Sequence, residues 1–368
     1  MPVDALLTAR PALDPGVHPA PMPALATSSA PGHPRIRGFD GVRGLAVVAV
    51  IACHAWPEIF PGGSVGVQVF FVLSGYLITL LLLREWSRSD RLGLGRFYLR
   101  RALRLVPAMV VVAVATTVLF LVVDRGAGGL VYAEVALLYV SNWVRAMGRP
   151  MGPLGHTWSL AMEEQFYLLW PLVAWVAWRR WKGTGVAVAA ASGALLATGI
   201  AVTLTLAGAG RTRIDNGFDT ASAPLWIGCL CGVIAWHGVR PVVTRVVGAV
   251  TIPWLAVILF TRWGDHHVEV PLVHTATALG IGCALLAIST GWGASILERP
   301  ALKRLGVISY GLYLWNYPIT FIQGVQDLPG IIELPIVFGA ALVLSEVSYR
   351  VLETPFLRLK ERVAHAVR

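Results

Sequence analysis

The sequence predicts an all-α fold, a polytopic membrane helical bundle of about ten transmembrane helices, and three observations lead to this prediction. Of the 368 residues, 56% are hydrophobic and only 14% are charged, whereas a soluble domain of this length carries about 25% charge. The mean hydropathy is +0.67. Apolar runs long enough to cross a bilayer, about 20 residues each, recur along most of the chain.

The chain begins with a segment that differs from the rest. Residues 1–34 contain eight prolines and no apolar stretch long enough for a signal peptide, a composition typical of a disordered tail. We therefore expect a disordered cytoplasmic tail at 1–34. A membrane domain at 35–357 and a short cytoplasmic tail at 358–368 follow.

Ten apolar segments are predicted to span the membrane as helices. In chain order they are 41–56, 64–83, 105–123, 159–178, 185–207, 221–237, 246–261, 270–291, 305–322 and 331–349. The segment 130–147 is predicted as a re-entrant or interfacial helix. An eleventh crossing there would place the cluster Arg179-Arg180-Trp181-Lys182 outside, against the positive-inside rule.

The distribution of positive charge predicts the orientation. With the N-terminus inside, the inner segments hold 24 of the 30 Lys and Arg residues. Both termini are then cytoplasmic, and the protein is placed in the cell (inner) membrane with the lipid bilayer as a partner. The net charge of +10 has the same explanation, so no nucleic-acid partner is expected.

The cysteines are interpreted as small core residues. All four lie in apolar runs: Cys53, Cys229, Cys231 and Cys283. Cys229 and Cys231 have no second pair at zinc-site spacing, so no metal is expected.

His54 and Arg43 are ionisable residues of the first predicted span, and such residues are costly in a bilayer. Arg43 lies at the inner end and His54 near the outer end, about 16 Å apart by helix rise. His54 can exchange a proton near neutral pH, which makes it a candidate general base. The alternatives are a structural histidine bonded to a neighbouring helix and an arginine that only sets orientation.

The run RFYLRRALRLVP at 96–107 enters the third span from the cytoplasm. Arg101 and Arg104 are three residues apart and share a helical face. Paired guanidinium groups suit phosphate oxygens. An ordinary positive-inside loop is the alternative.

The run GHTWSLAMEEQFYLLWP at 155–171 enters the membrane from outside and carries adjacent carboxylates, Glu163 and Glu164. Glu163 and His54 are both predicted in the outer half of the bilayer. Glu163 is therefore expected to orient the imidazole and to support its cationic form.

A fourth run, ISYGLYLWNYPI at 308–319, is rich in hydroxyl and aromatic groups. Together with the third run it supplies the candidates for binding the acyl carbonyl or a sugar. These candidates are Ser159, Trp158, Tyr167, Tyr310, Tyr313 and Asn316.

These blocks, in this order, resemble the acyltransferase 3 family of integral membrane O-acyltransferases. The matching residues are Arg43-x10-His54, GVQVFFVLSGYLIT at 66–79, FYLRRALRLVP at 97–107, HTWSLAMEEQFYLLWP at 156–171, SYGLYLW at 309–315 and YRVLETP at 349–355. The resemblance covers nearly all of the chain beyond the tail.

The resemblance implies transfer of an acyl group, acetyl by default, from cytoplasmic acyl-CoA to a sugar hydroxyl of a cell-envelope glycan or a small glycoside. His54 matches the essential histidine of the family and Arg43 its paired arginine. Arg101 and Arg104 match a CoA-associated R-x-x-R motif. Glu163 matches the first glutamate of the block HTWSLAMEEQFYLLWP at 156–171, called the W-S-L block below. The chain is expected to be the stand-alone form, without a soluble esterase-like domain.

One departure and two alternatives stay open. The family commonly has W-H-x-P where this chain has Trp315-Asn316-Tyr317-Pro318, and an asparagine cannot shuttle a proton. Direct transfer is the expected route, with Cys53 as a candidate for a covalent intermediate. A proton-coupled transporter or flippase using His54 and Glu163 is the alternative function. The sequence makes no prediction of oligomeric state.

Overall fold

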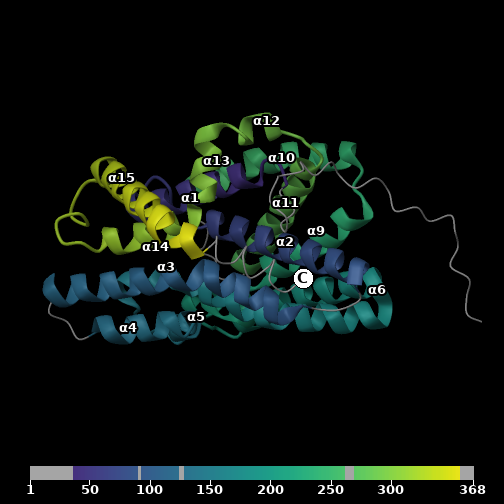
Figure 1. Ribbon diagram of the computed structural model, residues 1–368, viewed down its shortest axis with the longest axis horizontal. Helices are drawn as coiled ribbons and strands as arrows, with labels where there is room; N and C mark the ends of the chain where they lie inside the picture. Colours follow the sequence, from purple (N-terminus) through teal and green to yellow (C-terminus); the bar gives the residue numbers. More distant parts are fainter. Residues whose placement is uncertain (1–35, 90–92, 124–127, 262–268, 357–368) are drawn as a thin grey trace, which may run out of the picture.

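The computed structural model describes residues 36–89, 93–123, 128–261 and 269–356, so the predicted tails at 1–34 and 358–368 lie outside the described residues. The regular secondary structure of the described residues is helical throughout (Figure 1). Six helices in this part of the chain are long and apolar enough to cross a membrane. These findings confirm the predicted all-α membrane bundle.

The elements are numbered in chain order as in Figure 1. They are α1 (Phe39–Ala55), α2 (Val65–Ser89), α3 (Leu94–Val123), α4 (Gly128–Leu137), α5 (Ser141–Ala146), the 3₁₀ turn η2 (Gly152–Thr157), α6 (Trp158–Leu206), α7 (Arg211–Asn216), α8 (Phe218–Ala221), α9 (Ala223–His237), α10 (Pro241–Phe260), α11 (Glu269–Ser289), α12 (Ala294–Leu297), α13 (Pro300–Val307), α14 (Ser309–Thr320), α15 (Gly330–Ser348) and the π-helical turn η3 (Tyr349–Glu353).

Two of the predicted spans lie in the single element α6, which is broken in the middle. Trp181 and Lys182 have non-helical backbone torsions there, and φ of Lys182 is 53°. The break brings Gly185 beside the carbonyl of Ala177, although these residues would be about 12 Å apart in a straight helix. The chain therefore turns at the basic cluster, where the sequence predicts a connection between spans.

The segment 130–147 forms two short helices, α4 and α5, so the prediction of one helix there is wrong. The break falls at Tyr139, whose φ is 55°. Gln165 of α6 donates from Nε2 to the Tyr139 carbonyl (2.8 Å) and to Oδ1 of Asn142 (2.9 Å). A carbonyl inside a helix already accepts a hydrogen bond within that helix. The bond from Gln165 to the free carbonyl of Tyr139 therefore favours the break between the two helices.

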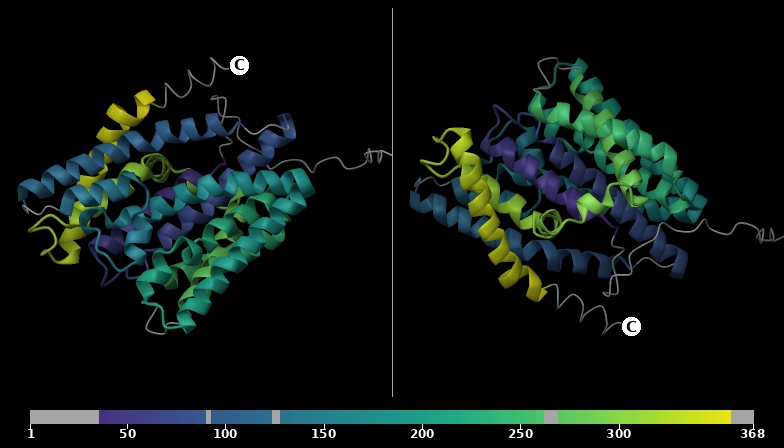
Figure 2. Two further views of the ribbon diagram at one scale, coloured as in Figure 1. Left: turned by 90° about the horizontal axis from the view of Figure 1, so that it is seen from below. Right: turned by 90° about the horizontal axis from the view of Figure 1, so that it is seen from above.

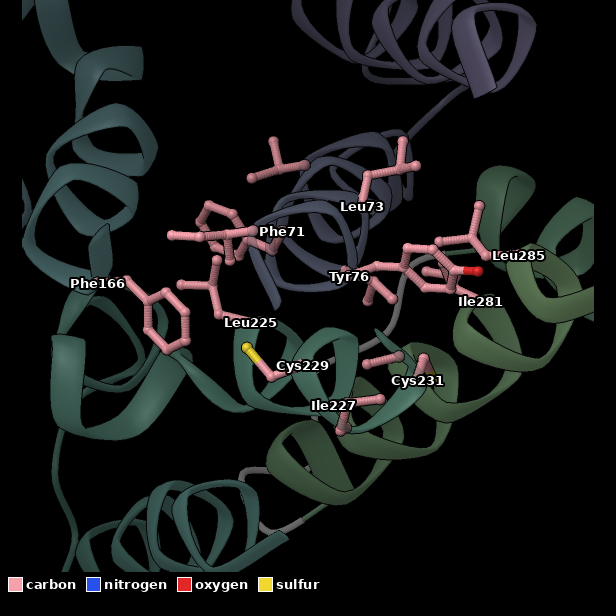
Figure 3. Packing of buried hydrophobic residues seen from close by; sticks show 14 of the residues in the cluster. Phe71, Leu73, Tyr76, Phe166, Leu225, Ile227, Cys229, Cys231, Ile281 and Leu285 are labelled. Atoms are coloured by element: carbon pink, nitrogen blue, oxygen red, sulfur yellow. The ribbon is translucent and has the colours of Figure 1, made fainter. Parts of the chain in front are cut away.

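The core is densest where α2 crosses α9. A Cβ atom on Gly75 would collide with the carbonyl of Leu225, and one on Gly228 would collide with the carbonyl of Val72. Small residues at a helix crossing let the two backbones approach closely inside a membrane. Figure 3 shows the side chains around this crossing, among them Cys229 and Cys231, which are 0% and 6% exposed. The predicted burial in the core is confirmed for these two cysteines, whereas Cys53 and Cys283 are only partly buried.

Apolar side chains also cover the outside of the bundle. α10 and α11 lie on the side opposite α15 (Figure 2). On α10 the exposed large apolar residues are Val242, Val243, Val246, Val247, Val250, Ile252, Val257 and Phe260. A soluble surface does not expose apolar patches of this size, so this face is suited to lipid.

Candidate active site

A cavity of about 120 Å³ lies between α1, α2, α3, α6 and α14. It brings together most of the polar residues singled out from the sequence. They are Arg43, Arg101, Arg104, Ser159, Glu163, Tyr167, Tyr310 and Tyr313. The cavity therefore joins the arginine run of α3 to the W-S-L block of α6, which are far apart in the sequence.

Arg101 is held by carboxylates inside this cavity. Its Nη2 lies 2.7 Å from Oε1 of Glu164 and 3.7 Å from Oε2 of Glu163. The guanidinium carbon also lies 3.3 Å from the ring centroid of Tyr167, a stacked cation–π contact. Arg101 is thus engaged with protein groups on two sides, and its charge balances the adjacent glutamates.

The other two arginines of the cavity are less engaged. Arg43 forms an ion pair of 3.6 Å with Asp40 in the preceding turn of α1. Among the described residues Arg104 has no carboxylate within ion-pair distance, and it interacts more weakly with the charges of Arg43 and Glu353. Two guanidinium groups of like charge at one end of a cavity form a site suited to an anion.

Glu163 does not contact His54, so the prediction that it orients the histidine is wrong. Its Oε1 accepts a hydrogen bond of 2.8 Å from Oγ of Ser74, and its Oε2 faces Arg101. Ser74 lies on α2 and was not among the candidates. It belongs to the block GVQVFFVLSGYLIT, where a hydroxyl in an apolar run could have marked it.

Asn316 is the partner of His54. Oδ1 of Asn316 lies 2.6 Å from Nδ1 of His54. Nδ2 of Asn316 donates to the carbonyls of Leu312 (2.8 Å) and Tyr313 (2.7 Å), which directs Oδ1 toward the histidine. His54 therefore carries its proton on Nδ1 and leaves Nε2 as a hydrogen-bond acceptor. The asparagine that departs from the family pattern orients the imidazole.

Helix rise explains why Glu163 and His54 lie at different levels. The His54 ring packs edge-on against Tyr317, with centroids 4.7 Å apart, and the same tyrosine lies 5.1 Å from His156. His54 is therefore level with the start of the W-S-L block. Glu163 is about 10 Å beyond His156 by rise, and it lines the cavity together with Arg43.

Two hydroxyl groups of the cavity lining contact each other, whereas His54 itself does not line the cavity. Ser159 and Tyr313 both line the cavity and their oxygens are 2.6 Å apart. The Tyr313 hydroxyl donates to the carbonyl of His156 at 2.8 Å. Tyr310 also lines the cavity, but its hydroxyl donates to the carbonyl of Leu105 at 2.8 Å.

Trp158 lies apart from the other candidates. It does not line the cavity, and its ring packs edge-on against Phe71 in the core, with centroids 6.1 Å apart. Asn316 is 0% exposed, does not line the cavity, and bonds His54 through Oδ1. The structure thus assigns Trp158 to packing and Asn316 to support of His54.

We predict that Asn316→Leu lowers kcat about 10- to 100-fold, because it removes the acceptor that orients the ring of His54. Asn316→His should retain more activity, since an imidazole can accept from His54 and donate to a carbonyl. Initial rates of acyl transfer by purified protein measure both. Thr320→Val, one turn further along α14, is the matched control. Equal rates for Asn316→Leu and the wild type would contradict this role.

The fold and the site define a class: an integral membrane protein with a histidine and an arginine-lined cavity enclosed among its helices. The family model described as an acyltransferase domain, acyltransferase 3, matches residues 36–350. The chain belongs to this family.

Curated proteins with similar sequences carry consistent names. The chain is 35% identical over 349 residues to the peptidoglycan O-acetyltransferase OatA of Listeria monocytogenes, covering 87% of this chain and 55% of that protein. It is 31% identical over 350 residues to the O-acetyltransferase OatA of Staphylococcus aureus, covering 86% of this chain and 56% of that protein. The chain thus spans little more than half the length of these relatives. No solved structure matches.

Proposed function

We propose that this protein transfers an acyl group, acetyl by default, from cytoplasmic acyl-CoA to a sugar hydroxyl at the outer side of the membrane. One observation carries the proposal. His54 is held by Asn316 with Nε2 free to accept a proton. Its ring packs on Tyr317 beside His156, and the carbonyl of His156 accepts from Tyr313, which lines the arginine-lined cavity. A transporter would also use intramembrane ionisable groups, but it would not need a base in this orientation.

The donor is assigned to the arginine-lined cavity. Arg43 and Arg104 supply positive charge for the phosphates of CoA, while Arg101 keeps Glu163 and Glu164 neutralised. The thioester arm then extends past Tyr313 and Ser159 toward His54. This revises the expectation from the R-x-x-R motif, because only its second arginine is left to face an anion.

The reaction at His54 is a direct acyl transfer. The acceptor hydroxyl gives its proton to Nε2 of His54 as its oxygen bonds to the thioester carbonyl carbon. The carbonyl oxygen takes up the negative charge. When the carbon–sulfur bond breaks, the imidazolium returns the proton to the CoA sulfur. Asn316 stabilises the cationic ring by accepting from Nδ1–H throughout.

The acceptor class rests on the relatives. OatA of Listeria monocytogenes and the protein YrhL of Bacillus subtilis, which is 30% identical over 352 residues, are both named for peptidoglycan. A glycan of the cell envelope is therefore the proposed acceptor. A small glycoside offers the same hydroxyl chemistry and is the alternative.

The proposed orientation has both termini in the cytoplasm of a cell (inner) membrane protein. We predict that a reporter fused after Lys182, at the break of α6, is cytoplasmic, because the positive cluster there is retained inside. Alkaline phosphatase and green fluorescent protein fusions measure the side. A fusion after Arg211 should report the opposite side, and phosphatase activity after Lys182 would contradict the orientation.

The activity can be tested with purified protein in nanodiscs, acetyl-CoA and a β-1,4-linked N-acetylglucosamine oligosaccharide. Release of the CoA thiol together with an acetylated oligosaccharide in the mass spectrum supports the proposal. Thiol release without acetylated product would indicate hydrolysis. No thiol release with any acyl-CoA, but proton-coupled uptake of a solute into proteoliposomes, would favour the transporter.

A further inference from the structure

His156 is a buried histidine that the proposed reaction does not use. The residue is 2% exposed. The backbone groups of Leu314 and Pro153 lie near its ring, but neither ring nitrogen makes a hydrogen bond of full geometry among the described residues. A buried polar group without a partner costs free energy. Native proteins keep few such groups, and those they keep require an explanation such as a ligand.

The surroundings of His156 place it at the reaction site. Its ring centroid lies 5.4 Å from that of Tyr313, which lines the donor cavity, and 5.1 Å from that of Tyr317. The Tyr317 ring also contacts His54. His156 therefore lies next to Tyr313, which the thioester arm would pass, and next to Tyr317, which packs against His54.

Arg145 brings a positive charge to the same place from α5. A Cβ atom on Gly155 would lie 2.9 Å from Nη1 of Arg145 and 3.4 Å from the Tyr317 hydroxyl. The guanidinium thus lies against Gly155, the residue before His156. Any residue other than glycine at this position would displace it. Nε of Arg145 donates to Oδ1 of Asn216 at 2.9 Å, which fixes its direction. Its charge acts on both histidines.

We propose that His156 and Arg145 form the oxyanion site of the acyl transfer. The N–H of His156 donates to the thioester carbonyl oxygen, and Arg145 supplies the positive charge that stabilises it as the tetrahedral intermediate forms. The electron pair on that oxygen returns to carbon when the carbon–sulfur bond breaks. This inference rests on the proposed function. It gives a role to a buried ring that no described protein group satisfies with a hydrogen bond of full geometry: the ring donates to the substrate.

The experiment compares variants of the full chain in nanodiscs, with acetyl-CoA and the N-acetylglucosamine oligosaccharide as substrates. His156→Ala should lower kcat about 100- to 1000-fold, as for loss of one oxyanion donor, with little change in KM for either substrate. His156→Gln keeps an N–H donor and should recover part of the rate. Arg145→Met should lower kcat, and Arg145→Lys should lose less.

Two control variants change the same residue types elsewhere. His274 lies on α11 and Arg149 is exposed beyond α5, so His274→Ala and Arg149→Met should keep the wild-type kcat. A wild-type kcat in His156→Ala overturns the oxyanion site. A loss in His156→Ala that appears in KM alone, without recovery in His156→Gln, also overturns it. An inactive wild type instead refutes the proposed function itself, which separates the two failures.

Discussion

His54→Ala is expected to lower kcat for acyl transfer about 100- to 10,000-fold, the range for loss of a general base. The variant should still insert and fold, because His54 has one side-chain hydrogen bond, to Asn316, and otherwise contacts Tyr317. Thiol release from acetyl-CoA measures the rate. Size-exclusion chromatography and thermal unfolding in detergent report the fold. A folded variant with wild-type activity would exclude His54 as the base.

Cys53→Ser is the matched control for this experiment. Cys53 is the neighbour of His54 on α1, and its Sγ lies 3.7 Å from the carbonyl of Pro61. We expect Cys53→Ser to remain active, because the direct transfer does not use a thiol. An inactive Cys53→Ser together with a wild-type protein that forms an acyl adduct on Cys53 would instead support the covalent route.

Arg101→Met is expected to destabilise the folded protein by up to about 3 kcal/mol, the low end of the cost of removing one partner of a buried ion pair, because the side chains of Arg101, Glu163 and Glu164 are partly exposed. The substitution leaves Glu163 and Glu164 as adjacent carboxylates without the guanidinium that contacts both. It also removes the cation–π contact with Tyr167. Thermal unfolding of the purified protein in detergent measures the loss.

Arg100→Met is the control, since it removes a positive charge from the neighbouring position of α3 and should leave the unfolding temperature nearly unchanged. Arg101→Met combined with Glu163→Gln and Glu164→Gln should recover much of the stability, because no unpaired carboxylates remain. A variant Arg101→Met as stable as the wild type, with only a raised KM for acetyl-CoA, would return this arginine to a direct role in binding the donor.

Residue patterns predicted the helices and most of the polar groups that line the cavity, but not Ser74, which binds Glu163, or His156 beside the base. Apolar runs, and the preference of Lys and Arg for one side of the membrane, can be recognised in short segments of the sequence. For this reason each predicted span is observed as helix. The same local reasoning placed Arg43 and His54 at two ends of α1. It failed at 130–147, because the break at Tyr139 depends on a hydrogen bond from Gln165 of another helix.

Which polar side chains pair with one another depends on how deep in the membrane each of them lies. The sequence assigned Glu163 to His54 because both were predicted near the outer surface. The structure pairs Glu163 with Ser74 and Arg101. A difference of about 10 Å along α6 decides this pairing, and helix depth is set by packing between helices that the sequence does not show.

The sequence by itself determined the class of molecule: an all-α membrane bundle whose few intramembrane ionisable residues are too costly to keep without a function. Only the tertiary structure decided which of them act together. It pairs His54 with Asn316, brings three arginines and Glu163 together in one cavity, and buries His156 near the base without a hydrogen bond of full geometry among the described residues. The physical reason is that the composition of a segment shows whether it lies in lipid or in water. Contacts between segments that are distant in the sequence form only when the helices pack.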